Sequence, residues 1–155
     1  MAVFGKYQVY YGKIKSELEI IKANFGYMNL SKAFAHWYLA NYIKIDEQDI
    51  AETIIDGNGD NGIDAITVVK DSMTLYQFKF PDKEKNIEKA IDEKTVLKMF
   101  NGYKKLISQK KPRVGNDNFL NFREVIKEKN IFDYTIEFVV FNNTFSQPAE
   151  DVLEN

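Results

Sequence analysis

Apolar residues recur every three or four positions over much of the chain, which is the spacing of helices that bury one face. This spacing predicts helices at about 13–23, 30–43, 84–108 and 118–129. Asp46 can cap a further helix that runs to about residue 54, and residues 146–151 are typical of the start of another. The helix at 30–43 is apolar almost all the way round, so we expect it to be buried on more than one side.

Three shorter segments are rich in β-branched and aromatic residues and predict strands at 63–69, 74–80 and 134–141. The first two form a hairpin whose loop lies within residues 70–73. The third is strongly apolar, so we expect it inside the sheet with both faces buried. Helices, a hairpin, more helices and a strand follow in this order, which predicts an α/β fold with helices packed on a small sheet.

Composition limits the chemistry that this chain can perform. Its 155 residues suit a single domain, expected to span 1–155, and they include no cysteine and one histidine, His36. Disulfides, thiolate chemistry and cysteine-based metal sites are excluded, and a serine–histidine–aspartate triad is disfavoured. No apolar segment reaches the length of a membrane span and no signal peptide is evident, so we expect a cytoplasmic protein with no membrane partner. The chain stops as its last helix begins, which favours the N-terminal part of a longer protein over a natural end.

Polar side chains gather at one end of the predicted hairpin. If the loop occupies 70–73, Asp64 lies opposite Lys79. Side chains alternate along a strand, so Asp64, Gln77 and Lys79 share one face. They meet where the glycine-rich loop 56–62 enters. A carboxylate and an amide oxygen suit Mg²⁺, and an ammonium group beside them can stabilise negative charge that develops on a phosphate.

These residues carry a resemblance to a known superfamily. Asp64, followed after 12 residues by Gln77-Phe78-Lys79, resembles the PD-(D/E)XK nucleases in their D…QxK form. The fuller pattern, residues 56–66 with 76–80, is similar to the N-terminal domain of abortive-infection phage-resistance (AIPR) proteins and to type IV restriction endonuclease domains. The order of the elements is similar over residues 30–141, while the motif itself is confined to residues 56–80.

The resemblance implies a restriction-endonuclease-like core, a small mixed β-sheet flanked by helices. It also implies an endonuclease that hydrolyses phosphodiester bonds in DNA with Mg²⁺ or Mn²⁺, in defence against phage or foreign DNA. By this resemblance Asp64 binds the metal, Gln77 occupies the second acidic position and Lys79 is the catalytic lysine. The backbone carbonyl of Phe78 would be a further metal ligand. RNA as a substrate and a homo-oligomer stay open.

Gln77 departs from the commoner aspartate or glutamate and removes one negative charge from the metal site. That charge would then have to come from Asp60, Asp56 or Glu52. Glutamine also occurs at this position in the families named above, so an active enzyme remains compatible with it. The competing hypothesis is a catalytically silent module on the same fold that binds nucleic acid or a protein. The neutral glutamine, the scarcity of arginine and the net charge of −2 favour that hypothesis.

Each site residue also has a purely structural interpretation. Asp64 could satisfy backbone N–H groups at the end of a loop, and Lys79 could protect an edge strand against unwanted pairing. The loop from Asp56 partly resembles a calcium loop, but Asn61 stands where that loop needs glycine and Thr67 where it needs a bidentate glutamate. Residues that favour strands, Ala65 to Val69, follow where a calcium-binding loop of this kind is followed by a helix, and this disfavours calcium.

A lysine-rich segment between residues 83 and 113 is the best candidate for contacts with nucleic-acid phosphates, through Lys83, Lys110, Lys111 and Arg113. The net charge of −2 means that such affinity must come from a local patch. Acidic residues interrupt the segment, so a solvated helix face is an equal alternative. His36 and Trp37 are expected to be packing residues.

Overall fold

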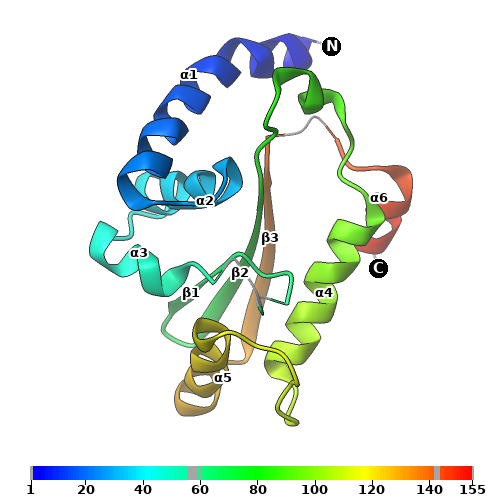
Figure 1. Cartoon of the computed structure of the whole chain (residues 1–155). Helices are drawn as coiled ribbons and strands as arrows, with labels where there is room; N and C mark the ends of the chain where they lie inside the picture. Colours follow the sequence, from blue (N-terminus) through cyan, green and yellow to red (C-terminus); the bar gives the residue numbers. More distant parts are fainter. Residues whose placement is uncertain (1, 56–58, 60, 142–143, 155) are drawn as a thin grey trace.

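Helices and a small sheet make up the computed structural model of the chain, which describes residues 2–55, 59, 61–141 and 144–154. In chain order the elements are α1 (Ala2–Phe25), α2 (Leu30–Asn41), α3 (Glu47–Thr53), β1 (Ala65–Val69), β2 (Ser72–Lys79), η1 (Glu84–Glu88), α4 (Glu93–Ile107), α5 (Asp117–Lys129), β3 (Asp133–Val140) and α6 (Gln147–Glu154). The fold is mixed α/β, with a three-stranded mixed sheet flanked by helices, and this confirms that part of the predicted fold class (Figure 1). No helix within the described ranges is long and apolar enough to cross a membrane.

The central strand of the sheet is β2. It pairs antiparallel with β1 and parallel with β3, so η1, α4 and α5 connect the two parallel strands. The prediction that the third strand lies inside the sheet is wrong, because β3 stands at the end of the strand order and most of its residues are half-buried. An apolar run also suits an edge strand whose faces are covered by helices, so the sequence pattern could not separate the two positions.

The hairpin turn is shorter than the predicted loop. Val69 pairs with Ser72, so Lys70 and Asp71 alone form the turn. Lys70 occupies the left-handed region with a φ of 56°, which a two-residue turn of this kind requires.

This turn corrects the register at the other end of the hairpin. Ala65 pairs with Tyr76, so Asp64 lies beside Gln77 and not opposite Lys79. The correction is a slip of two residues between the strands, and a slip of two keeps every side chain on its face. The three polar residues therefore share the face that the alternation predicted.

Each face of the sheet has its own hydrophobic core. α1 and α2 pack on the face that carries Tyr76 and Phe78, whereas α4 and α5 pack on the face that carries Ile66 and Leu75. α2 is buried on several sides, as predicted, because it contacts both α1 and β2 (Figure 1). His36 on α2 is buried, in agreement with a packing role. Asp64, Gln77 and Lys79 lie on the α4 side.

The long helix predicted at 84–108 is divided in two. η1 ends at Glu88 and α4 begins at Glu93, because the chain between them is extended and Ile91 forms a β-bridge with Phe145. Asp92 caps α4, and its Oδ1 accepts hydrogen bonds from the backbone N–H and the hydroxyl of Thr95 at 2.9 and 2.7 Å. The tyrosine-rich start of the chain, which predicted no clear element, belongs to α1 from Ala2 onward.

Candidate functional site

Asp64 is held at the point where β1 begins. Its backbone N–H donates to the carbonyl of Tyr76 at 2.9 Å, and its own carbonyl accepts from the N–H of Ile55 at 2.8 Å. The carboxylate turns back onto β2, where Oδ2 accepts a hydrogen bond of 2.7 Å from the backbone N–H of Phe78. Only 8% of Asp64 is exposed. Backbone contacts on both sides therefore fix a buried carboxylate against the central strand.

The carbonyl of Phe78 lies at the same edge of β2. Phe141 donates its N–H to the carbonyl of Lys79 at 3.0 Å, which shows that the Lys79 carbonyl points toward β3. Backbone polar groups of consecutive strand residues point to opposite edges, and a residue's N–H and C=O share an edge. The Phe78 carbonyl therefore points toward β1, the same way as the Phe78 N–H that Asp64 binds. Two of the predicted oxygen ligands are thus neighbours.

Gln77 adds an amide oxygen on the α4 face beside Asp64. The residue is 7% exposed, and its Oε1 is the buried side-chain oxygen that has no hydrogen-bond partner within the described part of the chain. Leaving a buried acceptor unsatisfied costs about 1–3 kcal/mol. A cation would satisfy it, and a carboxylate, an amide oxygen and a backbone carbonyl are the hard ligands that Mg²⁺ and Mn²⁺ take. The residues present therefore fit a divalent cation.

Lys79 follows Gln77 on the same face but is half-buried and borders open space. It lines a groove of about 440 Å³ together with Asn29 and Ser31 at the start of α2 and Lys89 and Asp92 before α4. Hydrogen bonds from Thr95 lower the pKa of Asp92, and the Lys79 ammonium group lowers it further. A substrate in this groove would meet the Lys79 side chain.

Of the other acidic residues that the sequence suggested, the structure describes Glu52, which lies away from Asp64. Glu52 is exposed on α3 and lines a different groove with Thr67 and Val68. Asp56 and Asp60 lie outside the described residues, as do residues 57 and 58 of the loop that resembles a calcium site. Among the residues that the structure does describe, no group of three or more acidic or histidine side chains gathers to hold a metal.

The described part of the glycine-rich loop packs tightly on α4 and on the segment before α5. A Cβ on Gly102 would lie 2.0 Å from the carbonyl oxygen of Asn61, so only glycine permits this approach. The Asn61 side chain donates to the carbonyl of Val114 at 2.9 Å, and the N–H of Asn116 donates to the carbonyl of Gly59 at 2.9 Å. These contacts hold the chain that leads into Asp64.

Gly102 and Ser31 are positioning residues that the sequence reasoning missed. A glycine inside a helix costs about 1 kcal/mol relative to alanine, so the presence of Gly102 was a signal of close backbone approach. Ser31 accepts a hydrogen bond of 3.3 Å from the N–H of Phe80, which ties the start of α2 to the end of β2. No sequence pattern pointed to that contact.

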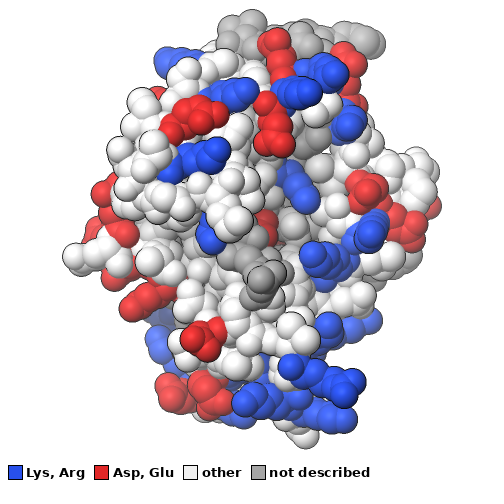
Figure 2. Space-filling view, in the orientation of Figure 1, with Lys and Arg blue, Asp and Glu red and all other residues white. Residues whose placement is uncertain are grey.

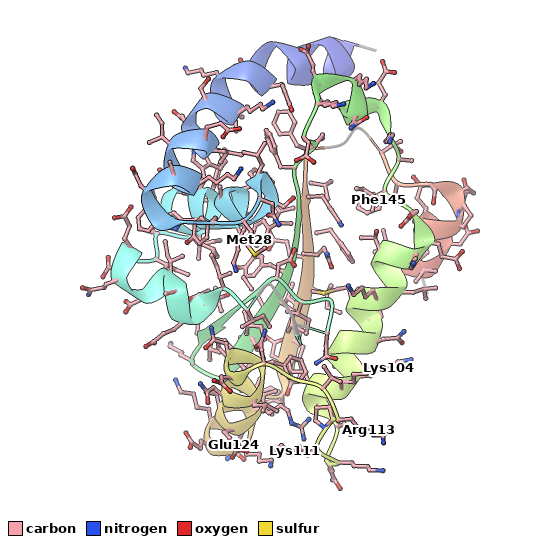
Figure 3. The ribbon with its side chains drawn as sticks, viewed as in Figure 1. Met28, Lys104, Lys111, Arg113, Glu124 and Phe145 are labelled. Carbon is pink, nitrogen blue, oxygen red and sulfur yellow. The ribbon has the colours of Figure 1, made fainter. Side chains whose placement is uncertain are left out.

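The predicted phosphate-binding residues are exposed but lie in two places. Lys83 precedes η1 in the green segment at the top of Figure 1, whereas Lys111 and Arg113 lie at the bottom, beyond the end of α4 (Figure 3). Lys110 belongs to the same loop as these two. Between the two places, α4 carries four exposed lysines: Lys94, Lys98, Lys104 and Lys105. Figure 2 shows basic side chains along this helix and around the lower end of the molecule.

Comparisons of the chain with protein-family models, with curated proteins and with solved structures found no significant match.

Replacing Gln77 with methionine is expected to raise the free energy of unfolding in the absence of metal. Methionine has a similar shape and removes the unsatisfied oxygen, whose burial costs about 1–3 kcal/mol. The same change should reduce the stabilisation that added Mn²⁺ confers, because one ligand is lost. Urea unfolding with EDTA and with Mn²⁺ measures both effects. A variant less stable than the parent in EDTA, with an unchanged Mn²⁺ effect, would contradict a ligand role for Gln77.

Proposed function

We propose that this chain is a nuclease domain that hydrolyses phosphodiester bonds in DNA with the help of Mg²⁺ or Mn²⁺. The observation that carries the proposal is the buried Oε1 of Gln77, which has no hydrogen-bond partner within the described residues and belongs to the residue that neighbours Asp64 across the hairpin. The D…QxK pattern and the mixed sheet flanked by helices agree with the restriction-endonuclease-like core that the resemblance implies. A role in defence against phage or foreign DNA rests on the resemblance to the AIPR proteins.

Asp64 would hold the metal through its carboxylate, and Gln77 and the Phe78 carbonyl would complete the protein ligands. The bound ion would polarise the scissile phosphate and lower the pKa of a water molecule. The hydrogen bond from Phe78 to Oδ2 orients the carboxylate, so the ligand needs little reorganisation to bind. Gln77 contributes an oxygen without a charge, and the site therefore holds the cation more weakly than a pair of carboxylates would.

Lys79 acts on the phosphate from the groove side. Its ammonium group donates a hydrogen bond to a non-bridging phosphate oxygen and stabilises the negative charge that develops there. Its position on the same face as Gln77, at the wall of an open groove, is what this role requires. Ser31 supports the geometry, because it accepts a hydrogen bond from the residue that follows Lys79.

The exposed lysines of α4 support nucleic acid as the substrate. They lie between the groove of Lys79 and the basic loop at the other end of the helix, and so offer phosphate contacts along one continuous element (Figure 2). With a net charge of −2 for the chain, such binding is local and weakens as salt rises. Lys83 lies apart from the basic loop, between Asp82 and Asn86 in the sequence, and both of these residues line the groove of Lys79.

Replacing Lys79 with alanine is expected to lower the rate of cleavage by about 10²-fold or more, because a donor to the developing charge is lost. Lys89→Ala is the matched control. Lys89 lines the same groove, but it lies between η1 and α4 and does not share a strand with Gln77. The assay uses supercoiled plasmid, single-stranded DNA and RNA, each with Mg²⁺, Mn²⁺ or EDTA. Thermal melting checks that both variants are folded.

Equal cleavage by Lys79→Ala and the parent would contradict the catalytic role of Lys79. If the parent binds DNA but cleaves none of the substrates with either ion, the nuclease proposal fails, and the catalytically silent module becomes the better hypothesis. Cleavage of RNA alone would keep the chemistry and change the substrate.

A further inference from the structure

The loop between α1 and α2 presents one apolar side chain to solvent. Met28 is 87% exposed, the highest value among the large hydrophobic residues that the structure describes. The loop around it is held on both sides. A hydrogen bond of 2.7 Å joins the Tyr27 hydroxyl to Nδ1 of the buried His36, and the Asn29 side chain caps α2 by accepting from the N–H of Lys32 at 2.8 Å. The backbone on both sides of Met28 is therefore fixed, while the Met28 side chain is exposed to solvent.

Met28 lies between two grooves. Asn29, which follows it, lines the groove of about 440 Å³ that contains Lys79. Tyr27, which precedes it, lines a second groove of about 500 Å³ together with Phe25 and Asn118. In Figure 3, Met28 lies near the middle of the face that also presents α4, with Lys104, Lys111 and Arg113 lower on that face.

The second groove has the chemistry of a site for a flat aromatic ring. Phe25 is 45% exposed and stacks on Tyr27, with ring centroids 6.0 Å apart and an interplanar angle of 21°. Asn116 and Asn118 line the opposite side, where α5 begins, but their side-chain amides hold α5 to the chain around α3 by donating to the carbonyls of Ile55 and Ile54 at 2.6 and 3.0 Å. Aromatic rings bind unstacked bases of any sequence, so the exposed ring of Phe25 carries the recognition. A nucleobase fits an exposed aromatic ring better than a phosphate does.

We propose that Met28 is an apolar wedge that inserts between bases of the substrate, and that an unstacked base enters the groove lined by Phe25 and Tyr27. This inference rests on the proposed function, because it takes nucleic acid as the substrate. Exposed methionine and other apolar side chains can separate base steps and kink a duplex. The adjacent groove of Lys79 then receives the phosphate of the distorted step, so the preferred substrate is one whose bases separate easily.

Binding without divalent metal tests this inference independently of cleavage. The probes are duplexes that carry a fluorescent adenine analogue at successive positions, whose emission rises when the base is unstacked. We expect the parent to raise this emission at one position or a few neighbouring ones. Met28→Ala should abolish the rise and weaken binding by about tenfold, the effect of losing one apolar contact. Met28→Leu, which keeps the apolar bulk, should retain both.

Phe132→Ala is the control variant, since Phe132 is 74% exposed but lies between α5 and β3, away from both grooves. An unchanged emission rise and affinity in Met28→Ala would overturn the wedge. That result, obtained with a parent that binds and cleaves DNA, would leave the nuclease proposal standing. A parent that binds neither DNA nor RNA would overturn both proposals.

Discussion

Asparagine at position 64 is expected to abolish cleavage while leaving the metal-free fold about as stable as the parent. The side-chain oxygen of asparagine can still accept the hydrogen bond that Phe78 donates to Asp64 at 2.7 Å. The negative charge that binds a divalent cation is lost, however, so added Mn²⁺ should stabilise Asp64→Asn much less than the parent. Urea unfolding with and without Mn²⁺, together with a plasmid cleavage assay, measures these effects.

Alanine at the same position separates the structural role of Asp64 from its proposed role as a ligand. Asp64→Ala leaves the buried N–H of Phe78 without its acceptor, which costs about 1–3 kcal/mol of unfolding free energy. Both variants should be inactive, but only the alanine variant should be clearly destabilised without metal. Full cleavage by Asp64→Asn would contradict the ligand assignment. A destabilisation of Asp64→Asn equal to that of Asp64→Ala would show that the charge itself stabilises the fold.

The shared face of Asp64, Gln77 and Lys79 could be predicted from the sequence because it depends only on alternation along two strands. The exact register of the two strands could not be predicted from the sequence. It depends on the turn, and Lys70-Asp71 lacks the glycine or asparagine that marks a two-residue turn. The predicted register was displaced by two residues, and because this number is even, the face survived the error. A displacement of one would have placed Asp64 on the opposite face from Gln77 and Lys79.

Long-range contacts explain why some elements differ from those that the sequence pattern predicts. Residues 84–108 read as one helix from local pattern, but Ile91 pairs with Phe145, more than fifty residues later in the chain, and the helix is interrupted there. The spacing of Asp92 and Thr95 was a local sign that a helix begins at this point. The edge position of β3 has no local sign, since it is decided by which strands pair.

Alanine at Gly102 is expected to be among the most damaging single-methyl changes in the described part of the chain. The new Cβ would lie 2.0 Å from the carbonyl oxygen of Asn61 and 3.2 Å from Cγ1 of Ile63, so either α4 or the glycine-rich loop must move. Overpacking of this kind costs about 1–3 kcal/mol or more. Movement of the loop would also displace Asp64, which follows Ile63 directly, so Mn²⁺ stabilisation and cleavage should fall together with stability.

Gly12→Ala is the matched control for this change. Gly12 also lies inside a helix, but it is exposed and a Cβ there would meet nothing within 4 Å. Alanine at that position should therefore raise the unfolding free energy by about 0.5–1 kcal/mol through helix propensity alone. Urea unfolding of the two variants measures the difference. If Gly102→Ala were as stable as the parent and bound Mn²⁺ equally well, the close approach of α4 to the glycine-rich loop would not be what positions Asp64.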